Sequence, residues 1–159
     1  RALMEDAYHM GAQARDFAKL LAETAGEHKP PLTFLGGIKT EEGRVDLKAG
    51  ALLPIVSTAR VLAIRHHVVA RATADRIGAI RDKGLGAADD LSRLIEVHRL
   101  VLHHVLTQQL DDVEHGVPLS AKVAVKRLTR AEADDLKTAL GRLSHLSTMT
   151  KDLLFAEVG

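Results

Sequence analysis

The sequence predicts an all-α fold, an antiparallel up-and-down bundle of four long helices plus a short helix, with a small β-hairpin near residues 34–48. Apolar residues recur at helical spacing over most of the chain, and glycine and proline fall mainly between these stretches. The chain has 159 residues, of which 46% are hydrophobic, so it can bury a proper core. We therefore expect residues 1–159 to form a single domain.

The first helix is expected over about residues 2–25. Gly26 ends its apolar pattern, and the Lys-Pro-Pro sequence that follows at 29–31 forces an extended link. Because the chain begins with Arg1 inside this helical pattern, we expect it to be a fragment of a longer protein. The apolar residues at helical spacing are Leu3, Met10, Ala14, Phe17 and Leu21.

Residues 34–48 alternate between apolar positions and polar or glycine positions, which suits two short strands. A glycine-containing turn at Glu41–Arg44 joins them. Such a hairpin is not stable alone and must lean on the helices. The alternating residues are Phe34, Ile38 and Thr40 in one strand and Val45 and Leu47 in the other.

The central helix is expected over about residues 52–67. Its apolar part holds a single charge, Arg60, and Pro54 falls in the first turn, where a helix tolerates proline. A short helix follows, with Thr73 as its expected N-cap and Gly84 at its end.

Two long helices complete the predicted bundle. One covers about residues 87–115 and is stopped by the Gly-Val-Pro sequence at 116–118. The other opens with a capping box, in which Thr129 and Glu132 satisfy free backbone amides reciprocally. The leucines of this last helix are Leu136, Leu140, Leu143, Leu146 and Leu153.

Composition argues against a nucleic-acid or membrane partner. Lys plus Arg number 22 and Asp plus Glu 21, which gives a formal net charge of +1 and no global field to attract polyanions. Aromatic residues make up 3%, which leaves no stacking platform for single strands. The chain has no cysteine, no signal peptide and no apolar run near the roughly 20 residues of a membrane span. These features predict a cytoplasmic protein.

Three segments stand out: PLTFLGG at 31–37, VDLKAGALLPIV at 45–56 and Thr-Ala-Arg at 58–60. Together they resemble a family known as the putative nucleotidyltransferase substrate-binding domain. The resemblance covers most of the chain, from about residue 31 to 155.

Two later segments are similar to the same family. Thr73 and the Asp-Arg-Ile sequence at 75–77 look like its Thr-x-x-Arg-Leu segment, and the glutamine pair at 108–109 stands where it tends to have His-Gln. The candidate substrate or partner contacts that lie in the resembling segments are Asp46, Lys48, Arg60, Arg76, Gln108 and Gln109.

The resemblance implies a non-catalytic substrate-binding and regulatory module. In the family, this module follows a PII-uridylyltransferase-like nucleotidyltransferase domain in bacterial signalling proteins with CBS or cyclic-nucleotide-binding domains. It would pack on that upstream domain and help to position the acceptor, which could be a protein. Mg²⁺ and a nucleoside triphosphate would belong to the upstream domain, and no cofactor is expected in the fragment.

An alternative stays open. The bundle could instead be an interaction or dimerisation module, with a homodimer as one form, that relays a CBS or cyclic-nucleotide signal without binding substrate. An uncovered apolar helix face would favour this alternative, whereas a polar cleft would favour substrate binding.

The fragment is not expected to be an enzyme. The related catalytic domains hold two Mg²⁺ ions on an Asp-x-Asp motif after a Gly-Ser turn, and the chain contains neither sequence. Its acidic pairs at 89–90, 111–112 and 134–135 are neighbours on expected helices, so their side chains point about 100° apart. We interpret each pair as part of a solvated helix face.

A metal site is not expected either. No two of the nine histidines are separated by three or four residues, the spacing that a helical site needs. Asp112 and His115 have carboxylate–histidine spacing, but a histidine at a helix end is explained by the macrodipole.

Two polar residues fall on the expected inward stripe of the helix at 87–115. They are His98 and Gln109, and a buried polar side chain costs about 1–3 kcal/mol unless it is hydrogen-bonded. They are either satisfied core residues or the lining of a pocket. The predicted stripe is Leu91, Ile95, His98, Leu102, Val105 and Gln109.

Arg60 is the strongest single candidate. A guanidinium among apolar residues is costly unless an anion meets it. The partner is either Asp46 or a carboxylate of the first helix, in a structural ion pair, or a phosphate or partner domain.

Overall fold

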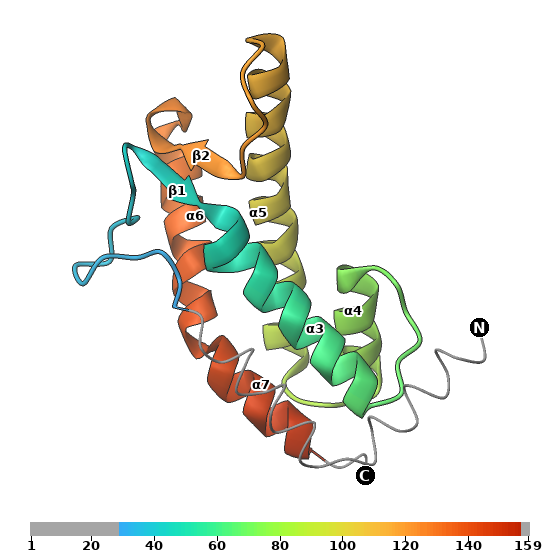
Figure 1. Ribbon diagram of the computed structural model, residues 1–159. Coiled ribbons are helices and arrows are strands. Elements are labelled where there is room, and N and C mark those ends of the chain that lie inside the picture. Colours follow the sequence, from blue (N-terminus) through green and yellow to red (C-terminus); the bar gives the residue numbers. More distant parts are fainter. Residues whose placement is uncertain (1–28, 157–159) are drawn as a thin grey trace. The chain divides into compact units, whose positions relative to one another are not determined.

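The computed structural model describes residues 29–156 (Figure 1). The helix predicted over residues 2–25 lies outside the described residues. The chain divides into two compact units, and the described parts of the first are Pro54–Ile95 and residues 145–156. The second unit comprises Lys29–Leu53 and Glu96–Ser144. The described residues are mostly helical, as predicted, whereas a single domain with up-and-down helix order stays a prediction.

The first unit contains α3 (Leu53–Arg65), α4 (Thr73–Asp82), the start of α5 (Ala88–Glu114) and α7 (Leu146–Phe155). Buried hydroxyls join two of these helices, because Thr58 Oγ1 and Thr150 Oγ1 lie 3.0 Å apart. At the end of α3, His66 Nε2 lies 2.7 Å from the Leu153 carbonyl oxygen. The largest fully buried side chains of this unit are Ile55, Leu62, Ile77, Ile80, Leu85, Leu91 and Leu154.

The second unit contains a two-stranded sheet and helices. Strands β1 (Arg44–Asp46) and β2 (Lys122–Ala124) pair antiparallel, with Val45 opposite Val123 (Figure 1). The rest of α5 and α6 (Arg130–Arg142) belong to the same unit. The shorter elements among residues 29–156 are π-helix Lys48–Leu52, 3-10 helix Val125–Arg127 and 3-10 helix Leu143–His145.

The predicted hairpin is wrong in its pairing. Glu41–Arg44 does form a turn, with two backbone hydrogen bonds of 2.8 and 2.9 Å, but β1 pairs with β2 and not with residues 34–40. Burial explains why β1 pairs with β2. Val45 and its partner Val123 are both buried, whereas Phe34 in the segment that we expected to pair is fully exposed.

The central helix begins one residue later than predicted and ends two residues earlier, and Pro54 lies in its first turn as expected. The chain enters it through the π-helix, where Gly50 meets Pro31. A Cβ on Gly50 would lie 2.7 Å from Pro31 Cδ, so only glycine fits this close approach.

Three expected helix ends are confirmed and one N-cap is wrong. Gly84 and Gly116 end α4 and α5 with φ of +71° and +65°, and the Thr129–Glu132 capping box opens α6. Thr73, by contrast, is the first residue of α4, and the N-cap is Ala72 without a side-chain bond.

The last predicted helix is two helices. α6 ends at Arg142 and α7 begins at Leu146, with one 3-10 turn between them. The Ser144 hydroxyl donates to the Gly141 carbonyl oxygen at 2.7 Å. Such local bonds compete with regular helical hydrogen bonding, which suits a break at this point.

Among residues 29–156, no helix combines the length and the apolar content that crossing a membrane requires.

Candidate functional site

The buried face of α5 differs from the predicted stripe. His98 and Gln109 are only half-buried, and Leu102 is 36% exposed. Residues three or four positions apart can both lie on the same face of a helix. The apolar pattern therefore predicts which residues face the core only to within about one position. The buried residues of α5 that the second unit contributes are Val97, Val101, His104, Val105, Gln108 and Asp112.

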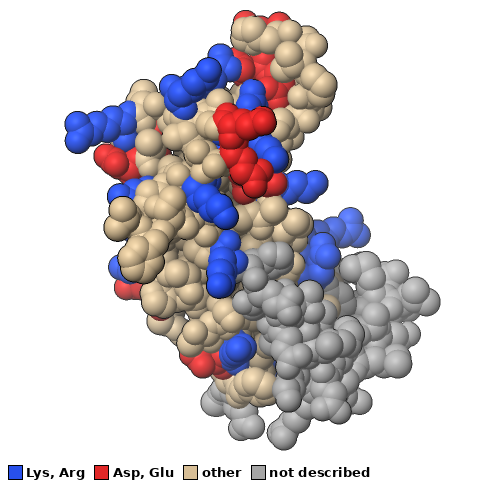
Figure 2. Space-filling view, turned by 60° about the vertical axis from the view of Figure 1, so that its left-hand side comes forward, with Lys and Arg blue, Asp and Glu red and all other residues tan. Residues whose placement is uncertain are grey.

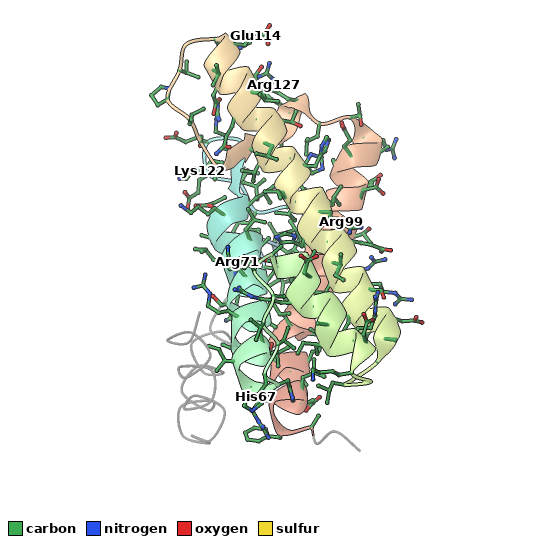
Figure 3. The ribbon with its side chains drawn as sticks, turned by 90° about the vertical axis from the view of Figure 1, so that its right-hand side faces the viewer. His67, Arg71, Arg99, Glu114, Lys122 and Arg127 are labelled. Atoms are coloured by element: carbon green, nitrogen blue, oxygen red, sulfur yellow. The ribbon has the colours of Figure 1, made fainter. Side chains whose placement is uncertain are left out.

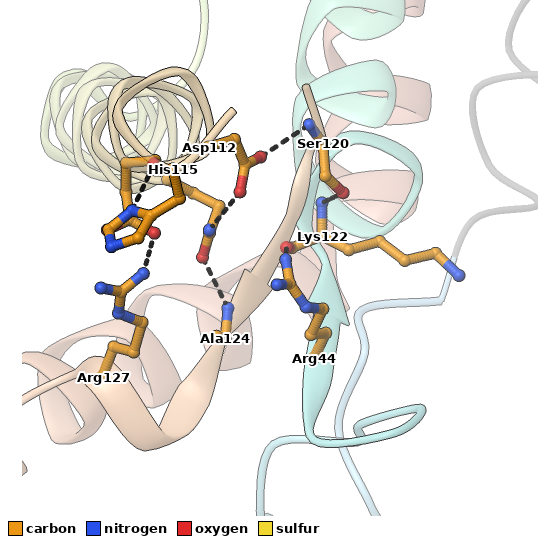
Figure 4. Close-up of polar contacts among 9 residues, drawn as sticks. Arg44, Asp112, His115, Ser120, Lys122, Ala124 and Arg127 are labelled. Carbon is orange, nitrogen blue, oxygen red and sulfur yellow. Dashed lines mark hydrogen bonds and ion pairs between the residues drawn. The ribbon is translucent and has the colours of Figure 1, made fainter. Parts of the chain in front are cut away.

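A buried polar network forms at the C-terminal half of α5. Gln108 Nε2 donates to Asp112 Oδ1 at 2.8 Å, and Gln108 Oε1 accepts the Ala124 N–H of β2 at 3.0 Å (Figure 4). Asp112 Oδ2 accepts the Ser120 N–H at 2.9 Å. Gln108 and Asp112 are 5% and 1% exposed, so the solvated face that we expected for the 111–112 pair is wrong for Asp112.

This network fixes β2 to α5. Gln108 contacts β2 and Asp112 contacts the loop that precedes β2. Two adjacent turns of α5 therefore hold the strand and its preceding loop in place. On the other side of β2, Arg44 Nη1 donates to the Lys122 carbonyl oxygen at 3.0 Å (Figure 4).

A second polar group lies next to the first. The Arg127 guanidinium forms an ion pair with the Asp111 carboxylate, and His115 Nδ1 lies 3.4 Å from the other oxygen of the same carboxylate (Figure 4). Arg127 is thereby held in place immediately after β2.

These two groups border a cavity of about 220 Å³ in the second unit. Most of the residues in its wall are polar or charged, and α5, β2 and the segment that leads into α6 all contribute to it. The lining residues are His103, His104, Thr107, Gln108, Asp111, Val123, Ala124, Arg127, Leu128 and Glu132.

His104 is the unusual member of this wall. Only 4% of it is exposed, and its Nε2 has no hydrogen-bond partner among residues 29–156. Burial lowers the pKa of His104 below its usual range, and the neighbouring His103 lowers it further. A neutral imidazole has one donor and one acceptor nitrogen, so the buried, unpaired Nε2 can bond a group of either kind that reaches it.

Glu132 brings a carboxylate to the same wall. The pKa of Glu132 is lowered because its carboxylate accepts hydrogen bonds from the Thr129 N–H and hydroxyl, at 2.7 and 2.8 Å. The capping box of α6 therefore also keeps a negative charge at the cavity.

Gln108 is the one predicted site residue that lines this cavity. Asp46 belongs to the same unit, but its Oδ1 accepts the Ala49 N–H at 2.9 Å and so closes the turn into the π-helix. Lys48 is exposed on that turn, and Gln109 is half-buried. His98 is half-buried with a lowered pKa, caused first by burial, and its Nδ1 has no partner in the described chain.

Arg60 and Arg76 belong to the first unit. Arg60 is exposed and forms no ion pair with Asp46 or with any other of residues 29–156. A carboxylate of the first helix, the other partner that we expected, lies outside the described residues. Arg76 donates from Nε to the Ala70 carbonyl oxygen at 2.8 Å and so fastens the loop before α4. Any contact of either residue with substrate stays a prediction.

The first unit has a cavity of its own, of about 350 Å³, between the start of α5 and α7. Gly86 lies at its edge with φ of +72°, and a Cβ there would lie 2.5 Å from Leu153 Cδ2. Asp90, His145 and Asp152 are its titratable lining residues.

One group of side chains has the composition of a cation site. The ligand atoms of Asp111, Glu114 and His115 lie within 4.8 Å of one another at the end of α5. Arg127 already neutralises Asp111, which opposes a cation there.

The described residues form a mostly helical fold with a cavity lined largely by polar residues, and the sequence contains no nucleotidyltransferase metal motif. Residues 15–153 match the model of the family described as "Putative nucleotidyltransferase substrate binding domain", and the chain belongs to that family. Comparison with curated proteins and with solved structures returned no match.

Proposed function

We propose that the chain is a non-catalytic substrate-binding and regulatory module of a nucleotidyltransferase-like signal-transduction protein. Membership of the substrate-binding family supports the general role. The cavity of the second unit supports a location for this role. The observation that carries the proposal is that His104, a residue of the cavity wall, has a buried Nε2 without a hydrogen-bond partner among the described residues.

The cavity suits a small polar group. Its volume of about 220 Å³ is below the roughly 300–1,000 Å³ of pockets that hold drug-sized ligands, so it would take one side chain or part of a nucleotide. A nucleotidyl acceptor must present a nucleophile such as a hydroxyl, which can hydrogen-bond with His104 Nε2. Burying that nitrogen unpaired costs about 1–3 kcal/mol, which a bonded ligand would recover.

The catalytic partner would be a nucleotidyltransferase domain earlier in the same protein. Mg²⁺ and the nucleoside triphosphate would bind there, because the metals must bridge the triphosphate. The chain would pack on that domain and position the acceptor, in the cytoplasm, under the control of a CBS or cyclic-nucleotide-binding domain. The loop Thr33–Gly37 is suited to such packing, because Phe34 and Leu35 are 103% and 90% exposed.

A nucleic-acid partner is not proposed. Lys and Arg side chains lie among neutral and acidic surface on the face that Figure 2 shows, without the basic stripe that phosphate backbones require.

The interaction module is the second candidate function. It is favoured by the exposed apolar residues of α5, among them Leu106 at 50% and Leu110 at 72%. Exposed apolar residues that gather on one helix face mark an interaction site.

Isothermal titration calorimetry on the 159-residue chain tests substrate binding. The probes are ATP, UTP and CTP with Mg²⁺ for the nucleotidyl donor, and the N-acetyl amides of serine, threonine, tyrosine and lysine for acceptor side chains. His104→Phe removes the unpaired nitrogen while keeping a ring, and Thr107→Trp fills the cavity from an exposed position.

Thr138→Trp is the matched control, because Thr138 is exposed on α6 and does not line the cavity. The proposal expects saturable binding of at least one probe that His104→Phe and Thr107→Trp abolish and Thr138→Trp retains. Binding that survives both cavity variants, or no binding of any probe, would overturn it.

A further inference from the structure

The outer face of α5 lacks the charges that a solvated helix normally carries. From Leu100 to Leu110 the sequence is LVLHHVLTQQL, which contains no Asp, Glu, Lys or Arg. An amphipathic helix at a protein surface has charged and polar residues opposite its buried stripe. Here that opposite side carries leucines.

These apolar residues share one face. Leu102, Leu106, Leu110 and Val113 follow one another at steps of four, four and three residues, which is the spacing of a helix–helix seam. They are 36%, 50%, 72% and 64% exposed, and we call them the α5 seam. The buried residues Val101, His104, Gln108 and Asp112 lie on the other side of the helix.

The two ends of the α5 seam carry opposite charges. Arg99 precedes it and Glu114 follows it, both are exposed, and neither forms an ion pair with residues 29–156 (Figure 3). Beside a second α5 running the opposite way, each basic end would face an acidic end. A parallel arrangement would instead place like charges together.

We propose that the chain self-associates into an antiparallel dimer through the α5 seam. The two-fold axis passes Leu106, so that Leu106 meets its copy and Leu102 meets Leu110 of the other protomer. Such an interface is isologous, because each contact occurs twice with its residues exchanged. Arg99 of each protomer then lies beside Glu114 of the other.

This inference is independent of the proposed substrate site. Two α5 residues of the cavity wall, His104 and Gln108, are buried on the side away from the seam, whereas His103 and Thr107 are exposed next to Leu102 and Leu106. His104→Phe therefore changes the cavity without changing the seam, so dimerisation and ligand binding can be measured and can fail separately.

Sedimentation velocity over a concentration series tests the dimer. Leu106→Glu places two like charges at the two-fold axis and should raise the dimer dissociation constant at least about tenfold, since central apolar contacts dominate interfaces. Val69→Glu is the matched control, because Val69 is also an exposed apolar residue, 66% exposed, but lies outside the seam. It should leave the dissociation constant unchanged.

Charge exchange tests the orientation. Arg99→Glu and Glu114→Arg should each weaken the dimer, and the double variant should restore it, because the antiparallel pair re-forms with reversed sign. A wild-type chain that stays monomeric at every concentration overturns the proposal. A dimer that Leu106→Glu leaves intact, or that the double charge exchange fails to restore, also overturns it.

Discussion

Asp112 places a carboxylate in the interior of the second unit, where it is only 1% exposed. Its two oxygens accept from Gln108 Nε2 and the Ser120 N–H. Asp112→Ala should lower the free energy of unfolding by about 2–3 kcal/mol, because hydrogen bonds to the carboxylate are lost and one buried and one part-buried donor are left unpaired.

Urea unfolding followed by circular dichroism measures this loss. Asp135→Ala is the matched control, because Asp135 is exposed on α6 and makes no described hydrogen bond, so its effect should stay within about 0.5 kcal/mol. Equal effects of the two substitutions would show that the network around Asp112 does not stabilise the fold.

At the residue scale, the sequence identified few of the important side chains. Gln108 was found through the family resemblance, whereas His104 and Asp112 were missed. The four-residue step from Gln108 to Asp112 was a usable signal, since it brings two side chains together on a helix. Their burial depends on contact with β2, and the local sequence pattern around Gln108 does not predict that contact.

At the element scale, the capping box of α6 makes a direct prediction. Thr129→Ala removes the acceptor for the Glu132 N–H and should lower the free energy of unfolding by about 1 kcal/mol. Thr138→Ala, in the middle of the same helix, should be neutral or stabilising because alanine is the better helix former. Chemical denaturation of both variants checks this, and equal losses would contradict the role of the cap.

Substitutions at two glycines before α5 distinguish the cost of a steric clash from the cost of backbone strain. Gly84 and Gly86 have almost the same φ, +71° and +72°, but only at Gly86 would a Cβ meet another residue, Leu153. Gly84→Ala should cost about 1–2 kcal/mol through its left-handed conformation. Gly86→Ala should cost roughly 1–3 kcal/mol more, because it also overpacks a buried leucine. Equal losses of stability for the two variants in thermal unfolding would contradict the close approach of Gly86 to Leu153.

Helices were predictable from local patterns, and the sheet was not. Glycine ends, Pro54 and the capping box act within a few residues, so α4, α5 and the start of α6 followed from the sequence. The pairing of β1 with β2 depends on which distant segment can bury Val45. The alternation of residues 34–40 was therefore a misleading signal.

At the scale of the whole molecule, stability should fall as the solution is acidified from pH 8 to pH 5. Burial is the main cause that lowers the pKa of His66, His98 and His104 in the folded protein. The unfolded chain then binds more protons as pH falls through its own histidine pKa near 6.5, which favours unfolding. The stabilisation is present above that pH and is lost below it.

Urea titrations at several pH values measure this dependence. Each histidine can contribute a slope of up to about 1.4 kcal/mol per pH unit. His104→Phe should therefore flatten the profile by removing one of the three groups. A wild-type profile that is flat from pH 8 to pH 5 would contradict the lowered pKa values of the three histidines.

The most direct test of the substrate site is the NMR signal of the His104 ring in a histidine-labelled chain, titrated with a probe that binds in calorimetry. We predict that the His104 ring signals shift and saturate with the probe while those of His66, which bonds Leu153 in the other unit, stay constant. Saturation of the probe with no change at His104 would contradict the account, because the ligand would then lie outside the cavity.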